Sequence, residues 1–151
     1  MLIRKSLYKK MLQKSDKPFK KILDLSYRPQ EFNNHFISIS HTRKIGGYFI
    51  TPNTPIGFDI EERARCKNHL YKKILSHPKE TGIEISKLWT LKEASLKAFG
   101  FLSEKISLKD ILIQQDPSCS KNYHIMYKNL TAQGLSLKTS FFTIALVKVI
   151  K

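Results

Sequence analysis

A short segment from Gly57 to Glu61 carries two carboxylates that alternate with apolar residues. Its length and its apolar residues predict a strand, on which Asp59 and Glu61, two residues apart, point to the same face. Gly57 allows a second backbone or a ligand to approach closely. Two explanations fit such an acidic pair: a functional site, or a strand edge that leaves its sheet for a charged turn.

A helix is predicted over residues 87–99, where apolar side chains recur at helical spacing and Gly100 suits the C-terminal cap. Trp89, Glu93 and Lys97 follow one another at intervals of four and share one stripe of this helix. A Glu–Lys pair at this spacing is also an ordinary surface ion pair. If this helix packs on the strand, however, its stripe and the acidic face of the strand bring three carboxylates and one ammonium together. Such a set is suited to a divalent cation beside a phosphate ester.

The remaining pattern predicts an α+β fold, because helices fall between groups of strands. A turn or a bulge is predicted at Gly46-Gly47, and a tight turn over residues 51–55. Strands are predicted over residues 22–25, 35–41, 48–50, 56–61, 111–114, 123–127, 135–139 and 141–150, and helices over 2–12, 68–76 and 87–99.

The net charge of +15, from 27 Lys and Arg against 12 Asp and Glu, predicts an anionic partner. Nucleic acid, a polyphosphate compound and an acidic protein all meet this description, but no nucleic-acid-binding motif is recognisable.

No apolar run reaches the roughly 18–20 residues of a membrane span, and no secretory signal is visible. Cys66 and Cys119 lack metal-site spacing and predict ordinary thiols in a reducing, cytoplasmic environment.

The two main segments, in this order, resemble the paired signature of the 4′-phosphopantetheinyl transferase superfamily, which includes the surfactin-type enzymes and holo-acyl-carrier-protein synthase. Weaker similarities lie around them, so that the resemblance extends from about residue 2 to about residue 150. The matching stretches are Ile56-Gly57-Phe58-Asp59-Ile60-Glu61, Leu88-Trp89-Thr90-Leu91-Lys92-Glu93-Ala94-Ser95-Leu96-Lys97, the Ser-His-Ser-like Ser40-His41-Thr42, the Gly-Lys-Pro-like Tyr27-Arg28-Pro29, and a Ser-x-x-x-Glu element from Ser76 to Glu80.

The resemblance implies an α+β fold of two similar halves, related by a pseudo-two-fold axis, with the active site between them. We expect an abbreviated N-terminal half over residues 1–55 and a C-terminal half over residues 56–151 that carries the metal site, in one compact unit. The surfactin-type branch has further structure before the position of Leu2, and this structure carries cationic side chains for the 3′-phosphate of coenzyme A. The Lys and Arg side chains at positions 4, 5, 9 and 10 are candidates to replace them. Phe101 replaces a glycine common in the family. Monomer and dimer both remain open, since a shortened sheet leaves an edge.

The implied activity is transfer of 4′-phosphopantetheine from coenzyme A to a serine of an acidic apo acyl or peptidyl carrier protein, with release of adenosine 3′,5′-bisphosphate. By resemblance, Asp59, Glu61 and Glu93 hold Mg²⁺, or Mn²⁺, on the pyrophosphate of coenzyme A. Glu93, directly or through water, is the candidate base for the serine hydroxyl, and Lys97 contacts the transferred phosphate. Coenzyme A binding is implied for Arg28, Ser40, His41, Asp59 and Lys97.

Two other functions are compatible with the sequence. A domain of the same fold could hold the carrier protein or coenzyme A without turnover. A basic nucleic-acid-binding domain is supported by charge alone.

Overall fold

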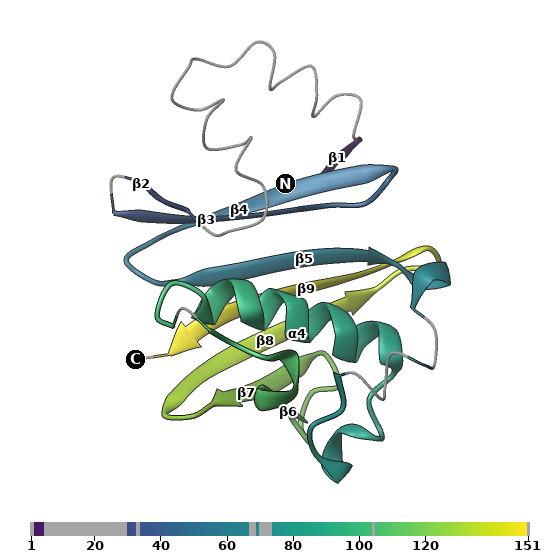
Figure 1. Ribbon diagram of the computed structural model, residues 1–151. Coiled ribbons are helices and arrows are strands. Elements are labelled where there is room, and N and C mark those ends of the chain that lie inside the picture. Colours follow the sequence, from purple (N-terminus) through teal and green to yellow (C-terminus); the bar gives the residue numbers. More distant parts are fainter. Residues whose placement is uncertain are drawn as a thin grey trace.

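The computed structural model describes residues 2–4, 30–32, 34–66, 69, 74–103 and 105–150. These residues form two antiparallel sheets and a long helix, which confirms the predicted α+β class (Figure 1). The first sheet has the strand order β1-β4-β3-β2 and the second β5-β9-β8-β7-β6. The elements are β1 (Leu2–Arg4), β2 (Gln30–Phe32), β3 (His35–His41), β4 (Ile45–Pro52), β5 (Ile56–Glu62), α4 (Ile85–Phe99), β6 (Leu112–Gln115), β7 (Asn122–Tyr127), β8 (Leu130–Lys138) and β9 (Phe142–Ile150), with short 3-10 helices η1 (Arg63–Arg65), η3 (Pro78–Glu80) and η4 (Leu108–Asp110).

Most predicted elements are confirmed, with ends that shift by a few residues. Helix α4 begins two residues before the predicted start and ends where expected, with Gly100 as its C-cap. The strands predicted from residue 35 onward correspond to β3, β4, β5, β6, β7, β8 and β9. The predicted strand over residues 22–25 lies outside the described residues.

Two predictions in the first sheet are wrong. Gly46-Gly47 is neither a turn nor a bulge but a regular part of β4, paired one-to-one with His41 and Ser40 of β3. Residues 2–4 are not helical but form β1, which pairs with β4. In both cases a neighbouring strand supplies the hydrogen-bond partners, and pairing between strands overrides the local pattern. The rest of the predicted helix, from residue 5 to residue 12, lies outside the described residues.

The helix predicted over residues 68–76 is also wrong at its end, because Leu75 and Ser76 are not helical. The backbone N–H of Ser76 donates to the Glu80 carboxylate instead of to a helix carbonyl. Residues 68 and 70–73 lie outside the described residues. Among the described residues, no helix has the length and apolar character needed to cross a membrane.

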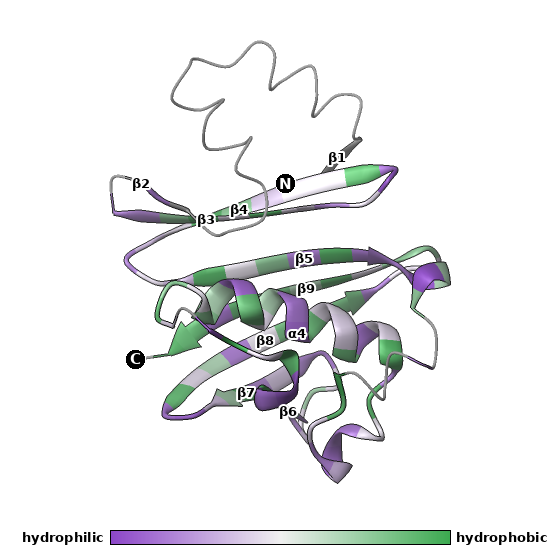
Figure 2. Ribbon diagram, in the orientation of Figure 1, coloured by the Kyte–Doolittle hydropathy of each residue, from purple (hydrophilic) through white to green (hydrophobic). Residues whose placement is uncertain are grey.

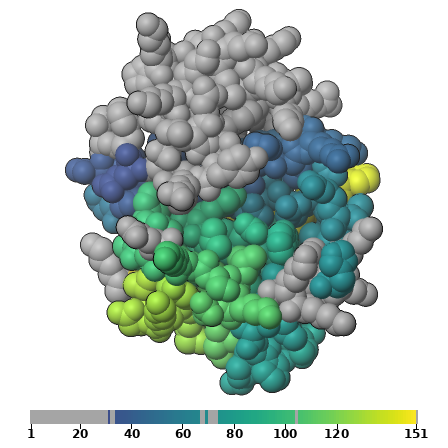
Figure 3. Space-filling model, viewed as in Figure 1, coloured from purple at the N-terminus to yellow at the C-terminus, as the bar shows by residue number. Residues whose placement is uncertain are grey.

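Helix α4 packs on one face of the second sheet, and the core lies between them. In the space-filling view, α4 and the segment after it lie across the front of that sheet, below the first sheet (Figure 3). The helix approaches β5 so closely that a Cβ on Gly57 would lie 1.7 Å from the Ala94 carbonyl oxygen. Strand β5 alternates apolar and polar residues (Figure 2), and Gly57 starts the face that meets the helix.

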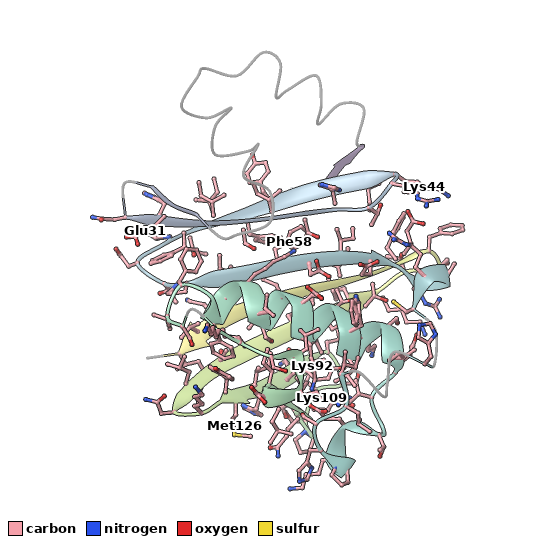
Figure 4. The ribbon with its side chains drawn as sticks, in the orientation of Figure 1. Glu31, Lys44, Phe58, Lys92, Lys109 and Met126 are labelled. Atoms are coloured by element: carbon pink, nitrogen blue, oxygen red, sulfur yellow. The ribbon has the colours of Figure 1, made fainter. Side chains whose placement is uncertain are left out.

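Side chains, not strand pairing, join the first sheet to β5, which is an edge strand of the second sheet. The Ser38 hydroxyl of β3 accepts the Phe58 N–H at 2.8 Å, and Ser40 accepts the Ile60 N–H at 3.3 Å. Phe58 lies between the two sheets (Figure 4), with its ring centroid 5.1 Å from that of Phe49 on β4. Serine hydroxyls therefore provide hydrogen-bond acceptors for N–H groups at the free edge of β5, and aromatic rings fill the space between the two sheets.

Candidate functional site

The acidic face of β5 lies against the Trp89–Glu93–Lys97 stripe of α4. Two residues of a strand rise about 6.6–6.8 Å and four residues of a helix about 6 Å, so the two spacings nearly match. The Trp89 side chain hydrogen-bonds to Glu61, and Lys97 pairs with Asp59. The structure therefore brings together the two segments that the sequence singled out.

Asp59 is the most constrained acidic residue of the site, with only 6% of its surface exposed. Its Oδ1 atom accepts hydrogen bonds from the Ser40 hydroxyl and from the Lys97 ammonium, both at 2.8 Å. Its Oδ2 atom is buried and has no hydrogen-bond partner within the described part of the chain. A buried carboxylate oxygen without a donor is unfavourable unless a ligand or water occupies the space beside it.

Lys97 does not form the helix-surface pair with Glu93 that its spacing allows. Its ammonium donates instead to the Asp59 carboxylate, to the Phe58 carbonyl oxygen at 3.0 Å and to the Ile39 carbonyl oxygen at 3.3 Å. An ammonium carries three N–H donors, so protein atoms occupy all of them. Contact between Lys97 and a phosphate would therefore replace one of these bonds.

The other two carboxylates, those of Glu61 and Glu93, both have raised pKa values. Partial burial and then the nearby Asp59 carboxylate raise the pKa of Glu61, although Arg65 and the Trp89 hydrogen bond oppose the shift. Partial burial and then Asp59 also raise the pKa of Glu93, with Lys97 opposing the shift and Glu61 adding to it. Each group responds to the others, as expected when carboxylates share one site.

Asp59, Glu61 and Glu93 carry the type of oxygen donor that a hard divalent cation prefers, and together they would hold such a cation only in part. Three carboxylates and one ammonium leave an excess of negative charge, and Oδ2 of Asp59 is an oxygen available to a hard cation. Within the described residues, no three His, Cys, Asp or Glu side chains are already grouped as a metal site. Mg²⁺ commonly takes one or two carboxylates and completes its shell with phosphate oxygens and water.

Of the residues predicted around the adenosine end of coenzyme A, the two that the structure describes, Ser40 and His41, point to opposite faces of β3. Ser40 points between the sheets toward Asp59. His41 is the next residue of β3 and therefore points to the opposite face, where its pairing partner on β4 is Gly46. Arg28 lies outside the described residues. The spacing of a strand thus separates two side chains that the motif placed together.

Cys66 follows η1 near the acidic residues, and its thiol has the character of an ordinary cysteine. Burial, then Glu61 and Asp59, raise the pKa of this thiol to about 11. It is therefore protonated at neutral pH and is a poor nucleophile. Cys119 lies near the start of β7, and both cysteines are free thiols.

A buried ion pair on the other side of α4 was missed by the sequence analysis. The side chains of Lys92 and Glu80 are fully buried, with Nζ and Oε2 3.2 Å apart, and Lys92 extends from the side of α4 away from the first sheet (Figure 4). Lys92 also donates to Ser76 Oγ, and Glu80 accepts the Ile113 N–H. Burial lowers the pKa of Lys92, and Glu80 opposes this. The signal was present: Lys92 follows buried Leu88 by four residues and so belongs to the buried face.

Neither a protein-family model nor a curated protein matches this chain.

Proposed function

We propose that this protein is a Mg²⁺-dependent 4′-phosphopantetheinyl transferase that modifies a serine of an acyl or peptidyl carrier protein. One observation carries the proposal: β5 and α4 assemble Asp59, Glu61, Glu93 and Lys97, with Oδ2 of Asp59 buried and lacking a donor within the described residues. The resemblance of both segments to the transferase signature supplies the reaction.

Asp59, through Oδ2, and Glu61 or Glu93 would hold the metal ion beside the pyrophosphate of coenzyme A. When bound, Mg²⁺ neutralises the charge of the pyrophosphate and orients it. Catalysis of phosphoryl transfer is mainly positioning and charge stabilisation, so few protein groups are required. Lys97 keeps Asp59 in place and adds positive charge near the same point.

Glu93 is the proposed proton acceptor. The serine oxygen of the carrier protein forms a bond to the pantetheine-linked phosphorus, the bond from this phosphorus to the bridging oxygen breaks, and adenosine 3′,5′-bisphosphate leaves with that electron pair. The serine proton passes to the Glu93 carboxylate, directly or through water. In the metal-free protein, burial and then the neighbouring carboxylates raise the pKa of Glu93, which favours uptake of a proton by this carboxylate.

The net charge of +15 supports both anionic partners of this reaction. Coenzyme A carries several phosphate charges, and carrier proteins are typically acidic. A strongly basic surface raises the rate of encounter with such partners, in a manner that salt weakens.

A second function, a binding module that holds coenzyme A or carrier protein without turnover, is favoured by one observation. All three N–H groups of Lys97 already have protein acceptors. If these bonds persist in the complex, the lysine does not reach the transferred phosphate, and the site binds without catalysing.

Mass spectrometry of an apo carrier protein separates the two functions. Apo carriers from fatty-acid and peptide synthesis are incubated with the protein, coenzyme A and Mg²⁺ or Mn²⁺, with and without a chelator. A gain of one phosphopantetheine mass that the chelator abolishes supports the transferase. No gain with any carrier, together with calorimetric binding of coenzyme A, supports the binding module and contradicts the transferase.

A further inference from the structure

Ser40 makes two hydrogen bonds that together fix the orientation of its hydroxyl group. The oxygen accepts the Ile60 N–H at 3.3 Å, and the hydroxyl proton is donated to Oδ1 of Asp59 at 2.8 Å. Only 8% of the surface of Ser40 is exposed. Because the backbone of β5 uses one lone pair of the hydroxyl, the hydroxyl proton is left for the carboxylate.

Asp59 is therefore held at Oδ1 from two sides. Ser40 reaches it from β3 and Lys97 from α4. The terminal torsion of an aspartate is broad, so a single donor restrains the carboxylate poorly. With two donors on the same atom, rotation costs both hydrogen bonds, and Oδ2 remains the oxygen turned to the place where no protein donor reaches it.

We propose that Ser40 is a positioning residue for Asp59, which presents Oδ2 to a divalent cation, and is not a contact of the adenosine end of coenzyme A. This inference rests on the cation site of the proposed function. Residues that orient a metal ligand typically change metal affinity by about 10- to 100-fold when they are removed.

Ser38 provides a matched control from the same strand. It lies two residues before Ser40, points to the same side of β3 and is also buried, with 1% of its surface exposed. Its hydroxyl accepts the Phe58 N–H at 2.8 Å, as Ser40 accepts that of Ile60. In the described part of the chain, no hydrogen bond joins Ser38 to Asp59. Both serines thus accept a backbone N–H of β5, but only Ser40 also donates to the Asp59 carboxylate.

The experiment measures Mn²⁺ binding to the full chain by electron paramagnetic resonance, alone and with coenzyme A, and thermal unfolding of the same samples. The variants are Ser40→Ala, Ser38→Ala and Asp59→Asn. Both serine variants are expected to lower the unfolding temperature. Only Ser40→Ala is expected to weaken Mn²⁺ binding, by about tenfold or more, while Ser38→Ala stays within about twofold of wild type. If Ser40→Ala does not fold, Ser40→Cys replaces it, because a thiol of similar size is a much weaker donor.

Equal Mn²⁺ affinity in Ser40→Ala and Ser38→Ala would overturn the positioning role and leave the proposed transferase intact. Wild-type affinity in Asp59→Asn, or no Mn²⁺ binding by the wild type under either condition, would remove the cation site and both proposals with it. A selective loss in Ser40→Ala supports the positioning role whether or not any carrier protein is modified.

Discussion

The Nζ atom of Lys97 lies 2.8 Å from Oδ1 of Asp59, and this ion pair joins α4 to β5 with side chains only 13% and 8% exposed. The same ammonium reaches the Ile39 carbonyl oxygen of β3. One side chain therefore links the helix to both sheets. Loss of either partner leaves a partly buried charge unpaired, so effects on activity at these two positions must be compared with effects on stability.

Glu93→Gln separates catalysis from stability better than a change at Asp59. Turnover is expected to fall by about 100-fold or more, because an amide cannot accept the serine proton. Stability is expected to stay the same or to rise, since burial and the nearby carboxylates disfavour the ionised Glu93. Carrier-protein modification and urea unfolding measure the two effects. Near-normal turnover in this variant would contradict its role as the base.

The stability of the metal-free protein is expected to fall as the pH rises above about 4.5, through the contribution of Glu61 and Glu93. The pKa of each is raised above its ordinary value of 4.5, so between that value and the raised pKa the folded state binds more protons than the unfolded state. The unfolding free energy then decreases with pH. The comparison is between urea unfolding of the wild type and of Glu61→Gln/Glu93→Gln from pH 4 to 8. The same slope in both proteins would show that these residues do not cause the dependence.

Gly57→Ala is expected to disrupt the packing of α4 on β5. The new Cβ would lie 1.7 Å from the Ala94 carbonyl oxygen, and backbone atoms cannot yield as a flexible side chain can. We expect a loss of about 3 kcal/mol or more, at or above the upper end of ordinary overpacking. Gly82→Ala is the control, because a Cβ there meets no atom within 4 Å. Similar unfolding midpoints for the two variants would contradict the close approach of helix and strand.

Lys92→Met is expected to destabilise the protein by about 3–5 kcal/mol, because it leaves the Glu80 carboxylate buried without its cation. Adding Glu80→Gln should restore part of this loss, because it removes the buried charge and its amide oxygen can still accept the Ile113 N–H, whereas its amide nitrogen cannot accept the Ser76 N–H. A double-mutant cycle in urea measures the coupling. Additive effects of the two substitutions would show that the pair is not coupled.

Local periodicity was enough to predict the elements that build the site. A strand repeats every two residues and a helix every 3.6, so Asp59 and Glu61 share a face and Trp89, Glu93 and Lys97 share a stripe whatever surrounds them. The same reasoning failed for Leu2–Arg4 and for Gly46-Gly47. Those residues take their structure from a neighbouring strand that their own sequence does not specify.

The periodicity of β5 and α4 limits which side chains can meet, and the packing of these elements selects the pairs that form. Lys97 pairs with Asp59, 38 residues away, and not with Glu93 four residues away, because the packing of α4 on β5 places the ammonium among buried acceptors. Packing of β3 against β5 likewise assigns the Ser40 hydroxyl to Asp59 and directs His41 to the opposite face. In a buried site, the distances and directions between groups of the folded backbone set which hydrogen bonds form. The spacing of residues in the sequence does not contain these quantities.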